Sequence, residues 1–227
     1  MAELNLAFVC VGAGRGVRFG GEKLAETLGP RTVFAAAIGA LARAVPEAAI
    51  IAVVEEGRLE FWRNVLSSDF PRAQFIVGGD RRQDSVRAGV LYAAQAGAEI
   101  VAVHDAARPL VDPKDVEAVI SALDGANGAI LTARVCDTVK TVDGDDMVVD
   151  TLSRDRLRFA LTPQVFRVAT LIEVWQRADP QRTWTDEAVL LESVGIPVRA
   201  VLARHPNPKI TTEEDLRVVR AMLEARS

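Results

Sequence analysis

The chain has 227 residues, of which 27 are Lys or Arg and 31 are Asp or Glu, so its formal net charge is −4. This mildly acidic balance lacks the basic excess that supports binding to the phosphate backbone, and it argues against a general nucleic-acid-binding protein. Hydrophobic residues make up 49% of the chain and charged residues 26%, which excludes disordered and fibrous proteins. A chain of this length can bury a large core, and we expect one domain over residues 1–227.

The sequence contains no apolar run near the roughly 20 residues that a transmembrane helix needs. Residues 1–11 include no basic side chain, so they lack the n-region of a signal peptide. Two cysteines, Cys10 and Cys136, are too few for a disulfide framework, and Cys10 lies in an apolar run where we expect a core residue. These features predict a cytoplasmic protein that does not bind membranes.

Short β-rich runs alternate with longer helical stretches along the chain. In chain order, strands are predicted at Leu4–Val11, Ile50–Val54, Gln74–Val77, Ile100–His104, Ala129–Ala133 and Val198–Leu202. Several of these runs are almost continuously apolar, as expected of parallel strands that helices cover on both faces. The alternation therefore predicts an α/β fold with a single doubly wound, mostly parallel sheet.

Apolar residues recur at helical spacing in two segments of the second half, residues 168–175 and 216–223. Two candidate capping boxes precede the second segment, one formed by Thr211 with Glu214 and one by Thr212 with Asp215. Either pair would start the last helix of the chain.

One segment breaks this alternation. Residues 134–142 and 147–152 have the pattern of two strands joined by a turn near Asp143-Gly144, which predicts a projecting β-hairpin at about residues 134–155. Such a hairpin has few core contacts of its own. It either covers an edge of the sheet or forms an arm that reaches a partner subunit.

A glycine-rich loop, residues 12–23 with the sequence GAGRGVRFGGEK, follows the first predicted strand. Glycines let the backbone approach an anion closely, and open α/β sheets bind ligands at the carboxyl ends of their strands. The loop is not a dinucleotide-binding GxGxxG motif, because Val17 or Phe19 stands where a glycine is required. It is not a Walker A loop either, because Glu22 precedes Lys23 and no Ser or Thr follows.

Three cations on this loop, Arg15, Arg18 and Lys23, suit a triphosphate, since arginine forks onto phosphate oxygens and lysine supplies a point charge. The alternative is a plain strand-to-helix turn with solvated charges.

With these residues in place, the loop resembles the signature loop of the 2-C-methyl-D-erythritol 4-phosphate cytidylyltransferase family. Five further segments match motifs of that family: residues 78–86 (GGDRRQDSV), 104–109 (HDAARP), 162–164 (TPQ), 185–188 (TDEA) and 207–211 (NPKIT). Together the matches span nearly the whole chain. The sequence departs from the family's pattern at Gly12, usually an alanine, and at Glu22, usually a proline.

The resemblance implies a Rossmann-like nucleotidyltransferase that joins CTP to a small polyol phosphate. A phosphate oxygen of 2-C-methyl-D-erythritol 4-phosphate would attack the α-phosphate of CTP, and pyrophosphate would leave. Because the nucleophile is already an anion, positioning and cationic stabilisation matter more than a strong base. The resemblance also implies Mg²⁺ held mainly by the CTP phosphates, with Asp105 as the one candidate protein ligand.

The resemblance further implies a role for each residue that matches a family motif. Four cations would act in catalysis: Arg18, Lys23, Arg154 and Lys209. The nucleotide would contact Gly12, Ala13, Gly14, Arg15, Gly16, Gly79, Asp80, Ser85 and Ala106. The acceptor would contact Asp105, Arg108, Thr138 and Thr185.

Some of these assignments have structural alternatives. Ser85 either reads the cytosine edge or bonds to backbone in the first turn of a helix. Asp105 and Arg108 either bind the sugar phosphate or brace a turn, and both readings can hold. Arg154 and Thr138 flank the hairpin, which in this family crosses a two-fold axis, so the resemblance implies a homodimer in which both serve the neighbouring subunit.

Two other functions fit the same motifs. A sister cytidylyltransferase that uses D-ribitol 5-phosphate shares most of them, and phosphate-binding cations say little about the carbon skeleton of the acceptor. A non-catalytic nucleotide-sensing module belongs to another class, and the presence of Arg18, Lys23 and Lys209 argues against it.

Overall fold

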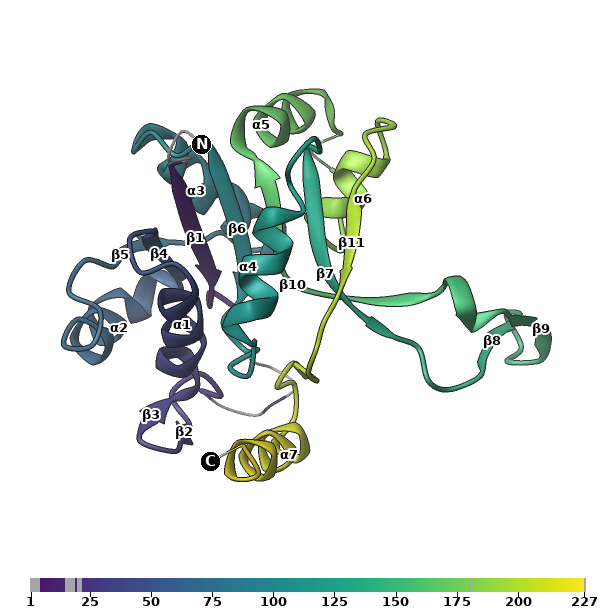
Figure 1. Cartoon of the computed structure of the whole chain (residues 1–227), viewed down its shortest axis with the longest axis horizontal. Coiled ribbons are helices and arrows are strands. Elements are labelled where there is room, and N and C mark those ends of the chain that lie inside the picture. Colours follow the sequence, from purple (N-terminus) through teal and green to yellow (C-terminus); the bar gives the residue numbers. More distant parts are fainter. Residues whose placement is uncertain (1–4, 15–18, 20–21, 180, 227) are drawn as a thin grey trace.

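The computed structural model describes residues 5–14, 19, 22–179 and 181–226. These residues form a central seven-stranded sheet with helices on both faces (Figure 1). In sheet order, the strands are β11 (Arg199–Leu202), β7 (Gly128–Arg134), β10 (Arg158–Arg167), β6 (Ile100–Asp105), β1 (Leu6–Val11), β4 (Ala49–Val54) and β5 (Gln74–Val77). The helices are α1 (Val33–Ala44), α2 (Leu59–Leu66), α3 (Arg82–Gln95), α4 (Pro113–Ser121), α5 (Val168–Arg177), α6 (Glu187–Glu192) and α7 (Glu213–Glu224).

Side chains of β1 alternate between two hydrophobic cores, as the pleat of a strand requires. Leu6, Phe8 and Cys10 belong to the core that α1, α4 and α7 cover, whereas Ala7 and Val9 belong to the core beneath α3, α5 and α6. The predicted doubly wound α/β fold is therefore confirmed. Cys10 is fully buried, as predicted, and burial raises the pKa of its thiol to about 12.

All six predicted strands are present, and β10 is a further strand of the sheet that the sequence pattern does not predict. Within the described sheet this strand alone runs antiparallel, pairing with both β6 and β7. Its ladder with β7 is interrupted between Ala160 and Gln164, and Pro163 lies in that interruption. A proline inside an apolar run argues against a central strand, because it cannot donate a ladder hydrogen bond. The interruption resolves this conflict and leaves Thr162 outside the regular pairing.

The last helix begins with the second of the two candidate capping boxes. Thr212 Oγ1 accepts a hydrogen bond from the Asp215 N–H at 3.3 Å, and Asp215 Oδ2 accepts one from the Thr212 N–H at 2.8 Å. Asp215 Oδ2 also accepts from the Thr211 N–H at 2.8 Å. This cap fixes the start of α7, a few residues after Lys209. Among the described helices, none is both long and apolar enough to cross a membrane.

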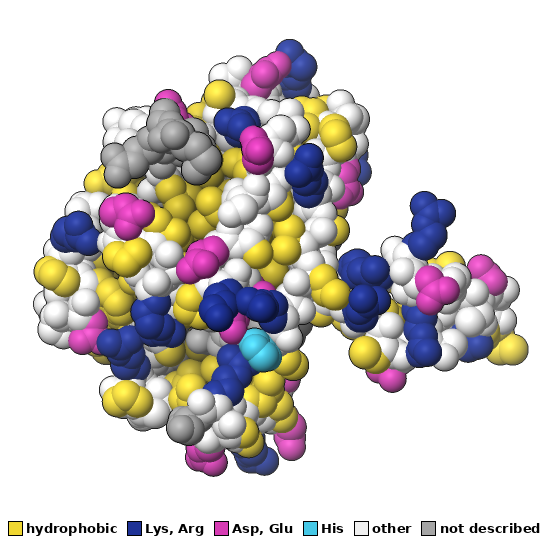
Figure 2. All heavy atoms as spheres, viewed as in Figure 1, with side chains coloured by type: hydrophobic (Ala, Val, Ile, Leu, Met, Phe, Trp, Pro, Cys, Tyr) yellow, Lys and Arg dark blue, Asp and Glu magenta, His cyan; other side chains and the backbone are white. Residues whose placement is uncertain are grey.

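The predicted hairpin is present as β8 (Val139–Val142) and β9 (Val148–Leu152), which pair antiparallel with each other. Figure 1 shows that it projects away from the body as an arm, so it does not cover an edge of the sheet. Five of its apolar side chains are exposed: Val142, Met147, Val148, Val149 and Leu152. Lys and Arg side chains gather along the arm and where it leaves the body (Figure 2). An unpartnered surface of this kind fits contact with another molecule.

Gly89 lies where α3 crosses β1 and β4, and a side chain has no room there. A Cβ atom at Gly89 would lie 2.3 Å from Val9 Cγ1 and 3.0 Å from Val53 Cγ2. We expect Gly89→Ala to lower the free energy of unfolding by about 1–3 kcal/mol, because the helix must move off the sheet. Urea denaturation measures this change.

Gly57→Ala is the matched control for that experiment. A Cβ atom at Gly57 meets no atom within 4 Å, so its free energy of unfolding should stay within about 0.5 kcal/mol of the parent. Equal unfolding free energies for the two variants would contradict the close packing of α3 on the sheet.

Candidate active site

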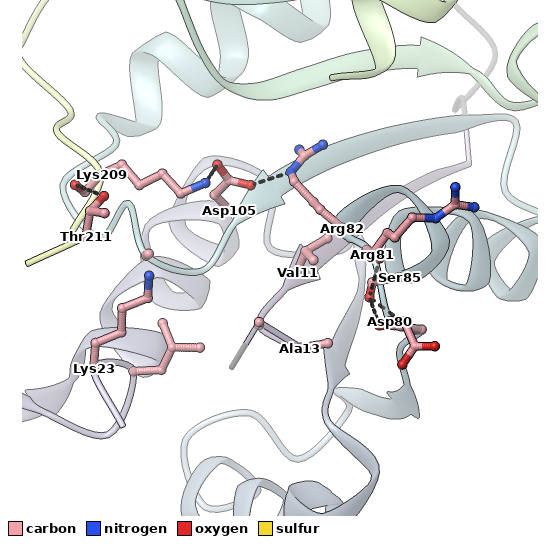
Figure 3. Close-up of a pocket in the computed structure, with 15 residues that line it drawn as sticks. Val11, Ala13, Lys23, Asp80, Arg81, Arg82, Ser85, Asp105, Lys209 and Thr211 are labelled. Carbon is pink, nitrogen blue, oxygen red and sulfur yellow. Dashed lines mark hydrogen bonds and ion pairs between the residues drawn. The ribbon is translucent and has the colours of Figure 1, made fainter. Parts of the chain in front are cut away.

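A cleft of about 330 Å³ lies at the carboxyl edge of the sheet, a size typical of small-molecule sites (Figure 3). The loops after β1, β5 and β6 form it together with the segment before α7. It contains many of the residues predicted from the sequence: Gly12, Ala13, Gly14, Lys23, Gly79, Asp80, Ser85, Asp105 and Lys209. It also contains four residues for which no role in the site is predicted from the sequence: Arg81, Arg82, Ala107 and Thr211.

The loop after β5 packs directly against the loop after β1. A Cβ atom at Gly78 would lie 2.6 Å from both Ala13 Cβ and Ser85 Oγ, so only glycine fits there. Gly12 continues the line of β1 by donating its N–H to the Val53 carbonyl at 2.8 Å. These contacts hold two glycine-containing loops on one wall of the cleft.

Ser85 supports the loop in which it lies. Its side chain is buried, and Oγ accepts a hydrogen bond from the Gly79 N–H at 3.1 Å. The hydroxyl also lies 3.2 Å from the Gly79 carbonyl and 3.3 Å from the Arg81 carbonyl, to which it can donate. This is the first-turn backbone bonding weighed above, and the reading of cytosine by Ser85 stays a prediction.

The Asp105 carboxylate is the electrostatic centre of the opposite wall (Figure 3). Its Oδ1 accepts a hydrogen bond from Arg82 Nε at 3.0 Å, and its Oδ2 accepts one from Lys209 Nζ at 2.8 Å. Arg108 Nε lies 3.7 Å from the same Oδ2. Burial raises the pKa of the Asp105 carboxyl, but these positive charges outweigh burial and hold that pKa well below its ordinary value. Asp105 is therefore ionised throughout the neutral range.

Arg82 connects Asp105 to a second buried carboxylate, Glu187. Arg82 Nη1 donates to both Glu187 oxygens, at 3.0 and 3.1 Å, and only 3% of the Glu187 side chain is exposed. Burial raises the pKa of Glu187 above its ordinary value. Both residues occur in segments that match family motifs, yet sequence alone does not show that charges 105 positions apart form a partly buried pair. The pair ties the start of α3 to the start of α6.

Arg108 braces the turn after β6, which is the structural role given above as the alternative to binding the acceptor. Its Nη1 donates to the Asn207 carbonyl at 2.7 Å. Arg108 and Lys209 also line a neighbouring hollow whose walls include the exposed ring of Phe159. The contact of Asp105 and Arg108 with an acceptor stays a prediction.

Glu22, the acidic residue beside Lys23, is directed toward the short helix η1 (Glu56–Arg58). Its Oε2 accepts from Arg58 Nη2 at 2.8 Å, and the pair is partly exposed. Lys23, the next residue, lines the cleft instead. Glu22, which departs from the family's pattern, is thus paired with Arg58. Lys23 lines the cleft beside the glycine residues of the loop, and its contact with phosphate stays a prediction.

Other predicted site residues do not line the cleft of their own chain or are not among the residues that the structure describes. Thr138 and Arg154 are exposed on the arm, where Arg154 donates to the Cys136 carbonyl and lies in a shallow hollow with Arg134 and Arg158. Within one chain, the structure therefore does not bring the arm residues to the cleft. Arg15, Gly16 and Arg18 lie outside the described residues.

Ala106 and Thr185 lie next to the site. Ala106 is fully buried and donates its N–H to the Val11 carbonyl at 3.0 Å, whereas its neighbour Ala107 lines the cleft. Thr185 is exposed just before α6, in a loop that α3 holds through a 2.8 Å hydrogen bond from the Trp184 N–H to Gln83 Oε1. The same loop leads to Glu187, so Thr185 lies between two residues that are hydrogen-bonded to α3.

Among the residues that the structure describes, no three His, Cys, Asp or Glu side chains are grouped so that they could hold a metal ion. Of the carboxylates that line the cleft, Asp105 already accepts from two cations. The donor set fits a metal ion that arrives with its own phosphate ligands better than one held by a protein cage.

Comparisons with known proteins agree on one family. The family model described as 2-C-methyl-D-erythritol 4-phosphate cytidylyltransferase matches residues 6–225. A relative of that name from Pelotomaculum thermopropionicum is 36% identical over 228 residues, which cover 98% of this chain and 95% of the relative. The bifunctional enzyme IspD/IspF of Nitrobacter winogradskyi is 37% identical over 213 residues; the match covers 92% of this chain and 53% of that relative.

Solved structures show the same fold. The 4-diphosphocytidyl-2C-methyl-D-erythritol synthase from Anaerococcus prevotii superposes with a TM-score of 0.85 and covers 96% of each chain, at 24% sequence identity. The overall fold is therefore shared with that structure.

Proposed function

The chain belongs to the 2-C-methyl-D-erythritol 4-phosphate cytidylyltransferase family, and we propose that the cleft at the carboxyl edge of its sheet carries out the family's reaction. The enzyme is a nucleotidyltransferase that transfers CMP from CTP to 2-C-methyl-D-erythritol 4-phosphate, a step of isoprenoid precursor synthesis, and releases pyrophosphate. One observation carries the assignment to this cleft: a glycine-loop wall with Lys23 faces a wall with Asp105 and Lys209 across the same hollow.

The nucleotide is proposed to lie against the glycine-loop wall. Backbone groups of Gly12, Ala13 and Gly14 line this side, and Lys23 extends into the hollow beside them. An ammonium group here offsets charge that develops on the α-phosphate in the transition state. The roles of Arg15, Gly16 and Arg18 remain predictions, as do those of Gly79, Asp80, Ser85 and Ala106 toward the base and ribose.

The acceptor is proposed to lie where the opposite wall meets the neighbouring hollow, near Lys209, which lines both, and Arg108, which lines the hollow. Both are cations beside Asp105, so a phosphate that approaches them meets positive charge, while the Asp105 carboxylate can accept hydrogen bonds from polyol hydroxyls. When the acceptor binds, the Lys209 ammonium group would leave Asp105 and pair with the acceptor phosphate instead. A phosphate bound there would lie across the cleft from the position proposed for the α-phosphate, as nucleotidyl transfer needs.

Mg²⁺ is proposed to enter the cleft bound to the triphosphate. The ion supplies charge neutralisation on the phosphate oxygens, and it ordinarily keeps several water ligands. Asp80 and Asp105 are the carboxylates among the described residues that line the cleft, and Asp105 already balances cations of the protein.

The active form is proposed to be a homodimer in which each arm reaches the other subunit's acceptor site. Two observations support this: the arm exposes Met147, Val148 and Val149, and its predicted substrate-binding residues, Thr138 and Arg154, do not line the cleft of their own chain. An arm from a second copy would cover that apolar surface and supply both residues. The cytoplasmic location stays a prediction from the sequence.

Release of pyrophosphate from CTP tests the proposed reaction. With Mg²⁺ and CTP, the purified enzyme should release pyrophosphate when 2-C-methyl-D-erythritol 4-phosphate is added, and at least about tenfold more slowly with D-ribitol 5-phosphate, because a pocket that hydrogen-bonds specific hydroxyls discriminates against a different polyol. A coupled pyrophosphate assay measures both rates. Faster release with the ribitol compound would favour the sister activity, and no release with either acceptor would contradict catalysis.

Mixing two inactive variants tests the shared site. Lys23→Ala removes a residue of the cleft, and Arg154→Ala removes a residue of the arm. If the arm serves the partner, a mixed dimer has one site that lacks both residues and one intact site. Co-purified mixed dimers should therefore recover about half of the parental turnover per mole of dimer, by the statistics of isologous pairing. If the mixed dimers were as inactive as the Lys23→Ala and Arg154→Ala homodimers, each arm would serve its own chain.

A further inference from the structure

His104 is a buried residue that the proposed reaction does not use. It lies in β6, directly before Asp105, and none of its side chain is exposed. The interruption in β10 places Thr162 beside it. An irregularity of this kind near a functional site often redirects one side chain, and here it directs the Thr162 hydroxyl at the end of β6.

The hydrogen bonds around His104 have defined directions. The Asp105 N–H donates to Thr162 Oγ1 at 3.1 Å, so the hydrogen of that hydroxyl points elsewhere. His104 Nδ1 lies 3.1 Å from the same oxygen and accepts it. His104 Nε2 lies 3.0 Å from the Arg108 carbonyl, which can only accept. The Arg108 carbonyl therefore requires a hydrogen on His104 Nε2, and in the neutral ring Nδ1 is then the acceptor for the Thr162 hydroxyl. Burial lowers the pKa of His104 to about 4, in agreement with a neutral ring.

A second branch connects Thr162 to the segment with Lys209. The Thr162 carbonyl accepts from Asn207 Nδ2 at 3.2 Å, and the Asn207 carbonyl accepts from Arg108 Nη1 at 2.7 Å. Asn207 is buried like Thr162. Both ends of the turn from Asp105 to Arg108 are thus bonded to one buried network, at the Asp105 N–H and at the Arg108 carbonyl.

We propose that His104 and Thr162 are positioning residues that fix the turn from Asp105 to Arg108 and thereby aim the acceptor-binding side chains. His104 acts as a two-ended bridge: its Nδ1 accepts from Thr162, and its Nε2–H donates to the Arg108 carbonyl. Neither residue lines the cleft, so both act through Asp105 and Arg108. The kinetic consequence rests on the proposed function, whereas the tautomer does not.

Thr162→Val and Thr162→Ser form a matched pair for the kinetic test. Valine keeps the shape of threonine without its hydroxyl, so the Asp105 N–H and His104 Nδ1 lose their partner; serine keeps the hydroxyl. We expect Thr162→Val to raise KM for the polyol phosphate about tenfold, with KM for CTP within about twofold, because the defect lies at the acceptor end. Thr162→Ser should stay within about threefold of the parent. Parental kinetics in Thr162→Val, or an equal rise in both KM values, would overturn the proposal.

A spectroscopic test does not depend on activity or on the folding of that variant. The chain has two histidines, and His205 is exposed, so His205→Gln leaves one imidazole to observe. Nitrogen-15 spectra of that protein near pH 7 should show an unprotonated Nδ1 and a protonated Nε2, unchanged down to about pH 5. A charged ring or the opposite tautomer would overturn the bridge. If the enzyme released no pyrophosphate but showed the expected tautomer, the proposed function would fail and the bridge would stand.

Discussion

The Asp105 carboxylate lies among the charges of Arg82, Arg108 and Lys209, which come from α3, the turn after β6 and the segment before α7. Removing one partner from a buried ionic group is costly, on the order of 3–5 kcal/mol, because the remaining charges are left unpaired. The three elements are therefore held together by one carboxylate. With Glu187 included, three cations face two anions, and the surplus of one positive charge favours a phosphate ligand.

The parallel sheet makes this cluster possible. Strands β1 and β6 are neighbours and end at the same edge, so Gly12 and Asp105 come within one cleft although they are far apart in sequence. Glycines at positions 78 and 89 let the next loop and helix pack without a gap. Behind Asp105, the bonds of Thr162 and His104 fix the turn from which the carboxylate projects. The site is thus supported on its buried side and open on the other.

Much of this could be predicted from the sequence, because the strands are apolar runs with clear limits. Gln74–Val77 was predicted to the residue, and the glycine loop, Asp105 and Lys209 were placed in one site. The strand β10 is not predicted because it contains Pro163, and a proline argues against a central strand. The pair of Arg82 and Glu187 is not predicted because charged residues are ordinarily on the surface, and only the fold shows that Glu187 is buried against a half-buried Arg82.

The arm differs from the rest of the site in the way that the sequence predicts it. Its hairpin is visible in the pattern around Asp143-Gly144, whereas the role proposed for Thr138 and Arg154 requires a second copy of the chain. A contact between two copies of a chain cannot be predicted from the order of residues in one copy. The feature of the arm that points to a partner is its group of exposed apolar residues.

The most direct test of the account is the kinetics of Asp105→Asn, since asparagine keeps the shape of the side chain and removes the charge that gathers the three cations. The account predicts that kcat/KM for 2-C-methyl-D-erythritol 4-phosphate falls by about 100-fold or more while KM for CTP changes less than about threefold. Exposed Asp124→Asn should match the parent. An unchanged kcat/KM for the acceptor in Asp105→Asn would contradict the claim that this carboxylate organises the site.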